Sequence, residues 1–144
     1  MEKALQDVQL EDGFKMKISF DFDGVLDTEK GQEFFKSLIH ANFLADPMGA
    51  PFNLVIVTTR HEDRNNEEIL RTAANLGMEV SKLIPKIIFT NGQWKWETIE
   101  KLGIDLHIDD NLDEVHLINE KCSSAQAVLF GANVHKILLE GTEL

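Results

Sequence analysis

Acidic and hydroxylated side chains end several of the short apolar runs in this sequence. Asp21 and Asp23 end the first run, Thr58 ends the second, and Asp109 and Asp110 end a later one. If these runs are parallel strands, their carboxyl ends share one edge of a sheet, and carboxylates distant in sequence can meet there. Carboxylates that close repel one another unless a cation lies between them. Hard oxygen ligands of this kind suit Mg²⁺, which binds through one or two carboxylates and substrate phosphate.

Apolar runs alternate with helix-like stretches along the chain in the order β-α-β-α-β-α-β-α-β. The expected strands are residues 16–22, 54–57, 87–89, 106–108 and 127–130. The first expected helix is capped by Thr28 and ends before Asp46, and the second begins with a capping box of Asn65 and Glu68 and ends at Gly77. The other two are residues 94–102, stopped by Gly103, and residues 111–121. This alternation predicts an α/β fold with a doubly wound, mainly parallel five-stranded sheet and helices on both faces. Residues 133–144 fit a strand or a helix equally.

The length and composition of the chain fit one globular domain over residues 1–144, with residues 1–13 as a loose arm. A net charge of -11 opposes binding to bulk nucleic acid and to anionic membranes. The lone Cys122 excludes an internal disulfide, and the first residues lack the basic patch and apolar run of a signal peptide. No apolar stretch approaches the roughly 20 residues of a membrane span. We therefore expect a soluble, cytoplasmic protein.

The residues at the expected strand ends resemble the motifs of the haloacid dehalogenase-like (HAD) superfamily. The segment DFDGVLDT, which begins at Asp21, resembles the first motif, and Thr58, closing the run LVIVT, resembles the second. Lys95 matches the third motif, and Asp109 with Asp110 resembles the fourth. The resemblance spans residues 16–130, and the order of the four motifs makes it specific. It implies a Rossmann-like fold with the motifs at successive strand ends.

The resemblance implies a phosphatase that works through an aspartyl-phosphate intermediate. Asp21 would attack phosphorus, and Asp23 would protonate the leaving oxygen and later activate water. The second aspartate argues for phosphatase chemistry, because family members that act as dehalogenases lack an acid there. Thr58 would hydrogen-bond a phosphoryl oxygen, and Lys95 would pair with both the phosphate and Asp21.

The resemblance also implies a bound Mg²⁺ ion and a set of residues that contact the substrate. The expected metal ligands are Asp21, Asp23, Asp110 and Asp109, the last acting through water. The residues expected to contact the substrate are Gly24, Thr59 and Arg60. Arg60 equally fits a surface arginine that pairs with Glu62 or Asp63.

Two assignments remain open between neighbouring candidates. Lys86 is the rival of Lys95 for the third motif, but Lys86 precedes an expected strand and should point away from the carboxyl edge, so we favour Lys95. The acidic residue that often follows the fourth motif is Asp113 or Glu114, and either also suits a helix N-terminus.

Other conspicuous side chains have structural interpretations. Trp94 and Trp96 suit packing first and stacking on a substrate ring second. His107 lies inside an apolar strand, and the histidines show no metal-binding spacing, so we assign His107 a structural role. Cys122 is expected to be a buried thiol.

The spacing between the motifs leaves no room for a cap domain. An open site suits either a nucleotide or a phosphorylated macromolecule as substrate. The sequence resembles the capless branch of the superfamily, which includes deoxyribonucleotidase-like and polynucleotide-phosphatase proteins. Nothing in the sequence indicates the oligomeric state.

Two other functions use similar residues. A receiver-type phosphoacceptor domain also combines Asp, Thr, Lys and Mg²⁺, but receivers place the acidic pair at the first strand and the acceptor at the third. Here the DxD motif is at the first strand and the acidic pair at the fourth. A non-catalytic phosphate-binding module on the same fold should lack catalytic residues, and none is evidently missing. The motif order therefore favours a hydrolase.

Overall fold

The computed structural model describes residues 16–45, 51–80 and 86–131. In chain order its elements are β2 (Met16–Phe20), η1 (Phe22–Leu26), α2 (Glu29–Ala45), β3 (Phe52–Thr58), α3 (Glu67–Val80), β4 (Lys86–Phe89), α4 (Trp96–Leu102), β5 (Leu106–Asp109), α5 (Leu112–Lys121) and β6 (Gln126–Leu129). The alternation of strands and helices is the one that the sequence predicts.

The five strands form one sheet in the order β4-β3-β2-β5-β6, and every neighbouring pair is parallel. The predicted fold class, a doubly wound parallel sheet, is therefore confirmed. The chain builds outward from β2 to β4 on one side and then returns to β5 on the other side of β2. The topological switch point consequently lies between β2 and β5, where ligands of such sheets bind beyond the strand ends.

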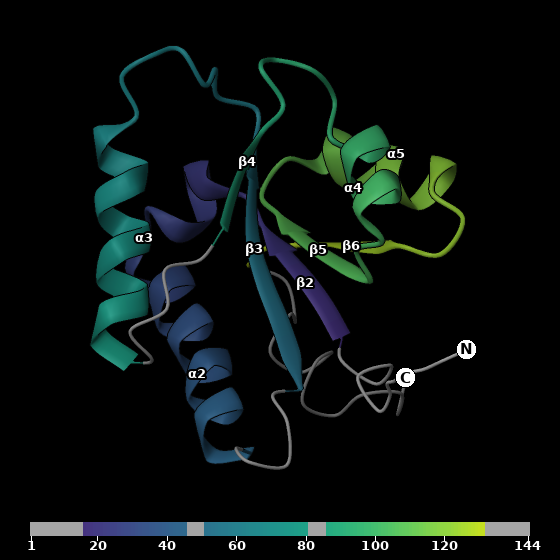
Figure 1. The fold of residues 1–144 in the computed structure, drawn as a ribbon. Helices are drawn as coiled ribbons and strands as arrows, with labels where there is room; N and C mark the ends of the chain where they lie inside the picture. Colours follow the sequence, from purple (N-terminus) through teal and green to yellow (C-terminus); the bar gives the residue numbers. More distant parts are fainter. Residues whose placement is uncertain (1–15, 46–50, 81–85, 132–144) are drawn as a thin grey trace, which may run out of the picture.

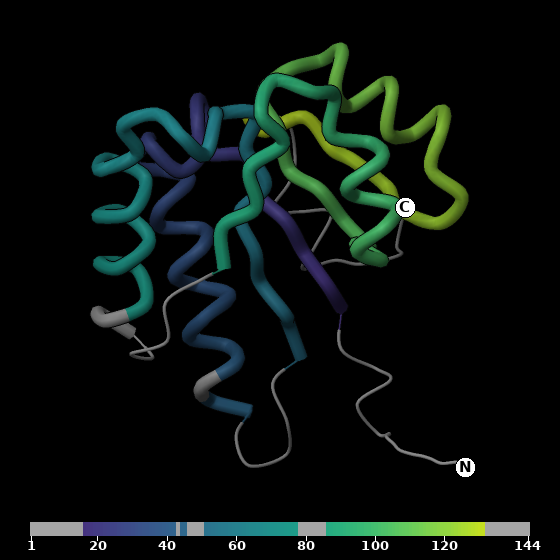
Figure 2. The backbone as a smooth tube through the Cα atoms, turned by 45° about the horizontal axis from the view of Figure 1, so that its top comes forward, coloured from purple at the N-terminus to yellow at the C-terminus, as the bar shows by residue number. Residues whose placement is uncertain are grey.

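Helices cover both faces of the sheet. Figure 1 shows α2 and α3 on one side of the strands and α4 and α5 on the other, and the turned view of Figure 2 shows the same division. One apolar cluster joins Phe35 and Ile69 of the first helix pair to the sheet, and a second joins Ile99 and Ile118 of the other pair to Val57 of β3. Two cores, one per face, thus hold the strand ends in place.

The spacing of aromatic and aliphatic residues explains why α2 packs on the sheet. Phe35, Leu38 and Ile39 recur on one side of the helix and are buried, as the sequence predicts. The ring of Phe35 meets that of Phe20 on β2 edge to face, with centroids 4.9 Å apart. This contact fixes α2 against the strand that precedes Asp21.

Several predicted boundaries differ from the structure. The first strand ends at Phe20, and Phe22 lies in the turn η1. Helix α3 continues to Val80, so the prediction that Gly77 ends it is wrong; Gly77 is buried within the helix. The predicted capping box is also wrong, because the Glu68 carboxylate accepts a hydrogen bond from Arg60, while Asn65 Oδ1 accepts one from the backbone N–H of Glu67.

The expectations for residues 1–13 and 133–144 concern parts of the chain outside the described ranges. Within those ranges no helix is both long enough and apolar enough to cross a membrane.

Gly31 of α2 lies directly against the backbone of Val25 in the turn η1. A Cβ on this residue would overlap the backbone carbonyl of Val25, and a backbone atom cannot rotate away. We therefore expect Gly31→Ala to lower the free energy of unfolding by about 1–3 kcal/mol, the usual range for overpacking. Chemical denaturation measures this change.

The matched control is Ser37→Ala on the exposed side of the same helix. Exposed substitutions of this kind normally change stability by less than about 0.5 kcal/mol. Equal stabilities of the two variants would show that α2 does not press on η1 as described.

Candidate functional site

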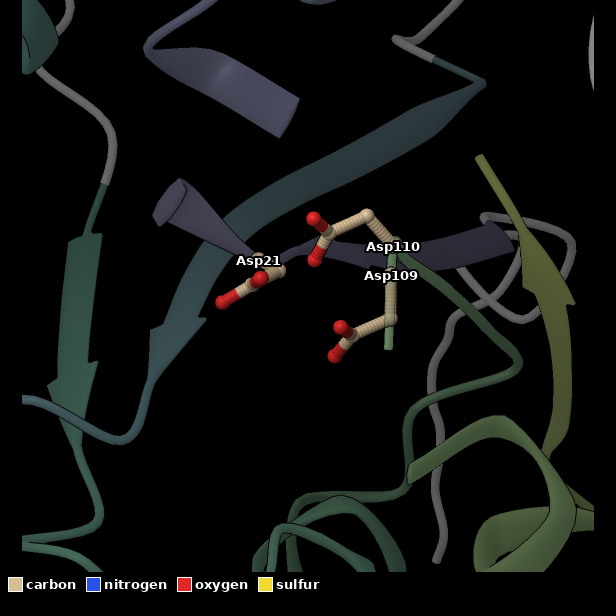
Figure 3. A group of neighbouring side chains, drawn as sticks. All are labelled: Asp21, Asp109 and Asp110. Carbon is tan, nitrogen blue, oxygen red and sulfur yellow. The ribbon is translucent and has the colours of Figure 1, made fainter. Parts of the chain in front are cut away.

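Three carboxylates meet at the switch point of the sheet. Asp21 follows β2, while Asp109 ends β5 and Asp110 comes directly after it. One oxygen of each carboxylate lies within 4.8 Å of one oxygen of each of the others. Asp21 and Asp109 are buried, whereas Asp110 is exposed. Figure 3 shows the side chains of Asp109 and Asp110 beside that of Asp21. The spacing and oxygen chemistry make this group a possible metal site.

A buried lysine joins two of these carboxylates. The Nζ of Lys95, from the loop before α4, lies 2.7 Å from Asp21 Oδ1 and 2.6 Å from Asp109 Oδ2, and its side chain is only 2% exposed. The carboxylate of buried Glu114 on α5 accepts a hydrogen bond from the backbone N–H of Lys95 at 3.1 Å. Lys95 is therefore held at its backbone and at its ammonium group.

The rival lysine and the rival acid lie elsewhere. Lys86 is exposed at the first residue of β4, at the end of the strand away from the carboxylates. Asp113 is exposed in the first turn of α5, and its backbone N–H donates to Asn111. The structure thus places Lys95 and Glu114 beside the site and leaves Lys86 outside it.

The turn η1 lies against the Asp110 carboxylate. Gly24 has a left-handed φ of 83°, which side-chain-bearing residues rarely adopt. A Cβ at Gly24 would overlap the Asp110 carboxylate, so the absence of a side chain there admits Asp110 to the group. The carboxylate of Asp27 accepts a hydrogen bond from the backbone N–H of Gly24 at 2.9 Å and fixes the turn.

The three carboxylates differ in how many donors they already contact. Asp109 Oδ2 accepts from Lys95 and from Nε2 of His107, and its Oδ1 accepts from the backbone N–H of Asn111. Asp21 is bound to Lys95 through Oδ1 alone. The Asp110 carboxylate accepts no hydrogen bond from any residue that the structure describes. Asp110 and the second oxygen of Asp21 are thus the atoms most available to a cation.

Burial and neighbouring charges shift the pKa values of Asp21, Asp109 and Lys95 by different amounts and in different directions. Burial raises the pKa of Asp21 to about 8 in spite of Lys95, and the nearby Asp109 adds to the rise. Burial also acts to raise the pKa of Asp109, but the hydrogen bond from His107 and the charge of Lys95 outweigh it and hold this pKa well below its ordinary value. Burial opposes the charge of Lys95, yet Asp21 and Asp109 raise its pKa. Asp109 therefore stays ionised beside Lys95 at neutral pH, while Asp21 holds its proton more tightly than an ordinary carboxyl.

Asp23, which the sequence also predicts as a metal ligand, is not part of this group of three carboxylates and pairs with Arg60. Arg60 Nη2 lies 2.7 Å from Asp23 Oδ1 and its Nε lies 3.1 Å from Oδ2, a two-point pairing. Arg60 also contacts Glu68 at 3.2 Å and lies over the ring of Phe22, 4.9 Å from its centroid. The partners of Arg60 are thus Asp23 and Glu68, in place of the Glu62 or Asp63 expected for a plain surface arginine.

The hydroxyl residues of the second motif lie at the end of β3. Thr58 is buried, and its Oγ1 accepts a hydrogen bond from the backbone N–H of Arg60 at 3.2 Å. The backbone carbonyl of Thr59 accepts from Gly92 at 2.7 Å, which ties the loop after β3 to the loop before Lys95. The predicted roles of both threonines toward a substrate stay predictions.

Sequence reasoning underestimated His107. Its buried ring contacts Asp109 through Nε2 and Ser19 Oγ through Nδ1, at 2.7 and 2.6 Å. A signal was present, because His107 and Asp109 are two residues apart on one strand and so share a face. The pairing with Ser19 needed the sheet register, which joins Ser19 to His107.

The two tryptophans differ. Trp96 packs in the core between the sheet and α4–α5, and the Nζ of Lys121 lies 5.4 Å from its ring centroid. Trp94 is 53% exposed on the loop that carries Lys95. Cys122 is partly buried, and its thiol donates to the carbonyl of Trp96 at 3.3 Å.

A scan against models of known protein families gives no match, and a search of curated proteins finds no significant relative. The fold and the acidic group at its edge therefore rest on the structure itself: a parallel five-stranded α/β sheet with Asp21, Asp109 and Asp110 gathered at its carboxyl edge.

The raised pKa of Asp21 predicts how stability depends on pH. Between the ordinary pKa of 3.8 and about 8, the folded chain keeps a proton that the unfolded chain has lost, so the free energy of unfolding falls as pH rises. The lowered pKa of His107 acts in the opposite sense, but only near or below its ordinary value of 6.5. We expect the melting temperature in chelator to fall between about pH 7 and about pH 8. Millimolar Mg²⁺ should flatten this slope, because a cation favours the ionised carboxylate.

Two variants identify the group responsible. Asp21→Asn should lose most of the slope in chelator, whereas Asp63→Asn, which removes an exposed charge, should keep it. An unchanged slope in Asp21→Asn would contradict the assignment to Asp21.

Proposed function

We propose that the chain is a Mg²⁺-dependent phosphomonoesterase that works through an aspartyl-phosphate, as its motifs suggest by resemblance to the HAD superfamily. The observation that carries this proposal is the contact of the buried Lys95 ammonium with both Asp21 and Asp109, next to Asp110. A carboxylate can attack an anionic phosphate only where positive charge offsets the repulsion. Lys95 supplies such a charge at the oxygen of Asp21.

The donor set fits Mg²⁺. The carboxylates of Asp21 and Asp110 have oxygens that accept no hydrogen bond from the described part of the chain, and Gly24 leaves space for Asp110 to approach. Asp109 is already engaged by three donors, so we assign it to Lys95 and assign the metal to Asp21 and Asp110. When bound there, Mg²⁺ would neutralise charge on the phosphoryl oxygens and on Asp21.

In the first step an oxygen of Asp21 forms a bond to phosphorus while the bond from phosphorus to the ester oxygen breaks. Asp23 gives a proton to the leaving oxygen. The Lys95 ammonium contacts the attacking carboxylate and offsets the charge that collects on the phosphoryl group. Thr58, buried at the end of β3, would donate a hydrogen bond to a phosphoryl oxygen.

In the second step water attacks phosphorus and transfers a proton to Asp23, and the bond between phosphorus and Asp21 breaks to release phosphate. Asp23 must leave Arg60 for both proton transfers, since Arg60 occupies both of its oxygens in the structure. A phosphate ester that draws Arg60 to itself would free Asp23 at the moment it is needed. Arg60 thereby couples substrate binding to the acid.

A substrate would reach the carboxyl edge without passing a cap domain. Between the strands the described chain contains single helices and short loops, and no inserted domain covers Asp21. Exposed Trp94 provides an apolar surface on the loop beside Lys95. We propose a nucleotide or the phosphorylated end of a macromolecule as the substrate class.

Replacing the nucleophile tests the reaction. Asp21→Asn keeps the side-chain volume but removes the attacking charge, so we expect turnover of para-nitrophenyl phosphate and of phosphorylated nucleotides to fall by at least about a thousandfold. That loss corresponds to about 4 kcal/mol of transition-state stabilisation. Steady-state kinetics with Mg²⁺ measures it.

Asp63→Asn is the charge-matched control and should retain wild-type rates, because Asp63 is exposed outside the carboxylate group. Full activity in Asp21→Asn would remove the covalent mechanism. Wild-type protein that becomes phosphorylated on Asp21 without releasing phosphate would instead indicate a phosphoacceptor.

The two lysines provide a matched pair. Lys95→Met leaves Asp21 and Asp109 buried without their cation, so activity should disappear and the free energy of unfolding should fall by about 3–5 kcal/mol. Lys86→Met alters an exposed residue at the far end of β4 and should change neither property by much. Kinetics and denaturation of both variants check this, and a silent Lys95→Met would overturn the assignment.

A further inference from the structure

A buried polar pair lies behind the carboxylates, deeper in the sheet. Ser19 on β2 and His107 on β5 are register partners, and both are 0% exposed. Ser19 Oγ lies 2.6 Å from His107 Nδ1, and His107 Nε2 lies 2.7 Å from Asp109 Oδ2. Together with Lys95 these contacts form a continuous chain of hydrogen bonds from Ser19 to Asp21.

This pair occupies sheet positions where apolar residues would pack more simply. Ile18 and Phe20, on either side of Ser19, belong to the core under α2 and α3. Side chains alternate along a strand, so Ser19 and His107 face the α4–α5 side. Burying polar groups there lowers stability unless every donor and acceptor is satisfied. One contact of His107 binds the site residue Asp109, and the other, with Ser19, holds the His107 ring in place.

Hydrogen-bond chemistry fixes the state of the ring. A carboxylate oxygen only accepts, so Nε2 of His107 must carry the proton that it shares with Asp109. In the neutral ring Nδ1 then accepts, and the Ser19 hydroxyl donates to it. Asp109 therefore fixes the tautomer, and the hydrogen bond with Ser19 at Nδ1 helps to hold the ring in the orientation that directs Nε2 to Asp109.

We propose that His107, oriented by Ser19, is a positioning residue that binds Asp109 and holds it toward Lys95. This inference rests on the proposed phosphatase function. His107 keeps Oδ2 of Asp109 occupied, so Asp109 remains the partner of Lys95 and leaves Mg²⁺ to Asp21 and Asp110. Without His107, Asp109 could turn toward the metal, and Lys95 would lose its fixed position beside the nucleophile.

The kinetic test uses four variants with para-nitrophenyl phosphate as the probe. His107→Asn lacks a donor at the position of Nε2, and kcat should fall about 10- to 100-fold with little change in KM, as is usual for residues that orient ligands. His107→Gln places an amide donor near that position and should recover most of the rate. Ser19→Ala should lower kcat less than His107→Asn does. His116→Asn, on the exposed side of α5, is the matched control and should retain wild-type kcat.

A second measurement does not depend on activity. Calorimetry with Mg²⁺ alone should give His107→Asn a dissociation constant equal to or lower than that of the wild type, because Asp109 becomes available to the cation. Asp110→Asn should bind Mg²⁺ more weakly and serves as the reference for a lost ligand. A long-range ¹⁵N–¹H spectrum should show the wild-type ring protonated at Nε2.

The outcomes separate the inference from the function. If the wild type hydrolyses phosphate esters but His107→Asn keeps wild-type kcat, or binds Mg²⁺ as weakly as Asp110→Asn, His107 does not position Asp109. The same conclusion follows if His107→Gln is no better than His107→Asn, or if the ring is protonated at Nδ1. If the wild type hydrolyses no ester, the proposed function fails, and the Mg²⁺ affinities and the ring spectrum alone decide the role of His107.

Discussion

The contact of one buried ammonium group with two carboxylates organises this edge of the sheet. Lys95 lies within 2.7 Å of Asp21 and 2.6 Å of Asp109, and each residue comes from a different element. The contact can form only if β2 and β5 are neighbours, since their carboxyl ends supply the two acids. It also requires the loop before α4 to reach over the strand ends, where Glu114 holds the backbone of Lys95. The strand order of the sheet thus determines the chemistry available at the site.

Burying these charged groups lowers the free energy of unfolding of the chain. Removing charges from water opposes burial, and replacing buried ion pairs with apolar residues often stabilises proteins. Here burial raises the pKa of Asp21 in spite of Lys95, and the charge of Asp109 adds to the rise. The stability of the chain must come from the two apolar clusters on either face of the sheet. The carboxylate group therefore makes more physical sense as a binding site than as a stabilising element.

The sequence was sufficient to predict the architecture and the meeting of the acids. Strand periodicity and helix spacing define the order of elements, and parallel strands must place Asp21, Asp109 and Asp110 at one edge. The choice of Lys95 over Lys86 followed from which end of the strand each occupies. The end of α3 was missed because Gly77 is a small buried residue within the helix, a packing role that local propensity does not reveal.

The contacts that decide chemical detail depend on geometry that sequence patterns do not encode. Arg60 reaches Asp23 and Glu68 because the turn after β3 directs it across Phe22, while nearer acids in the sequence lie elsewhere. Local spacing favours near partners, and only the fold brings Asp23 within reach. The same holds for Ser19 and His107, which become a pair through strand register. Asp23 and Asp21 thus acquire different partners two residues apart: Asp23 contacts a partly buried arginine, and Asp21 contacts a fully buried lysine.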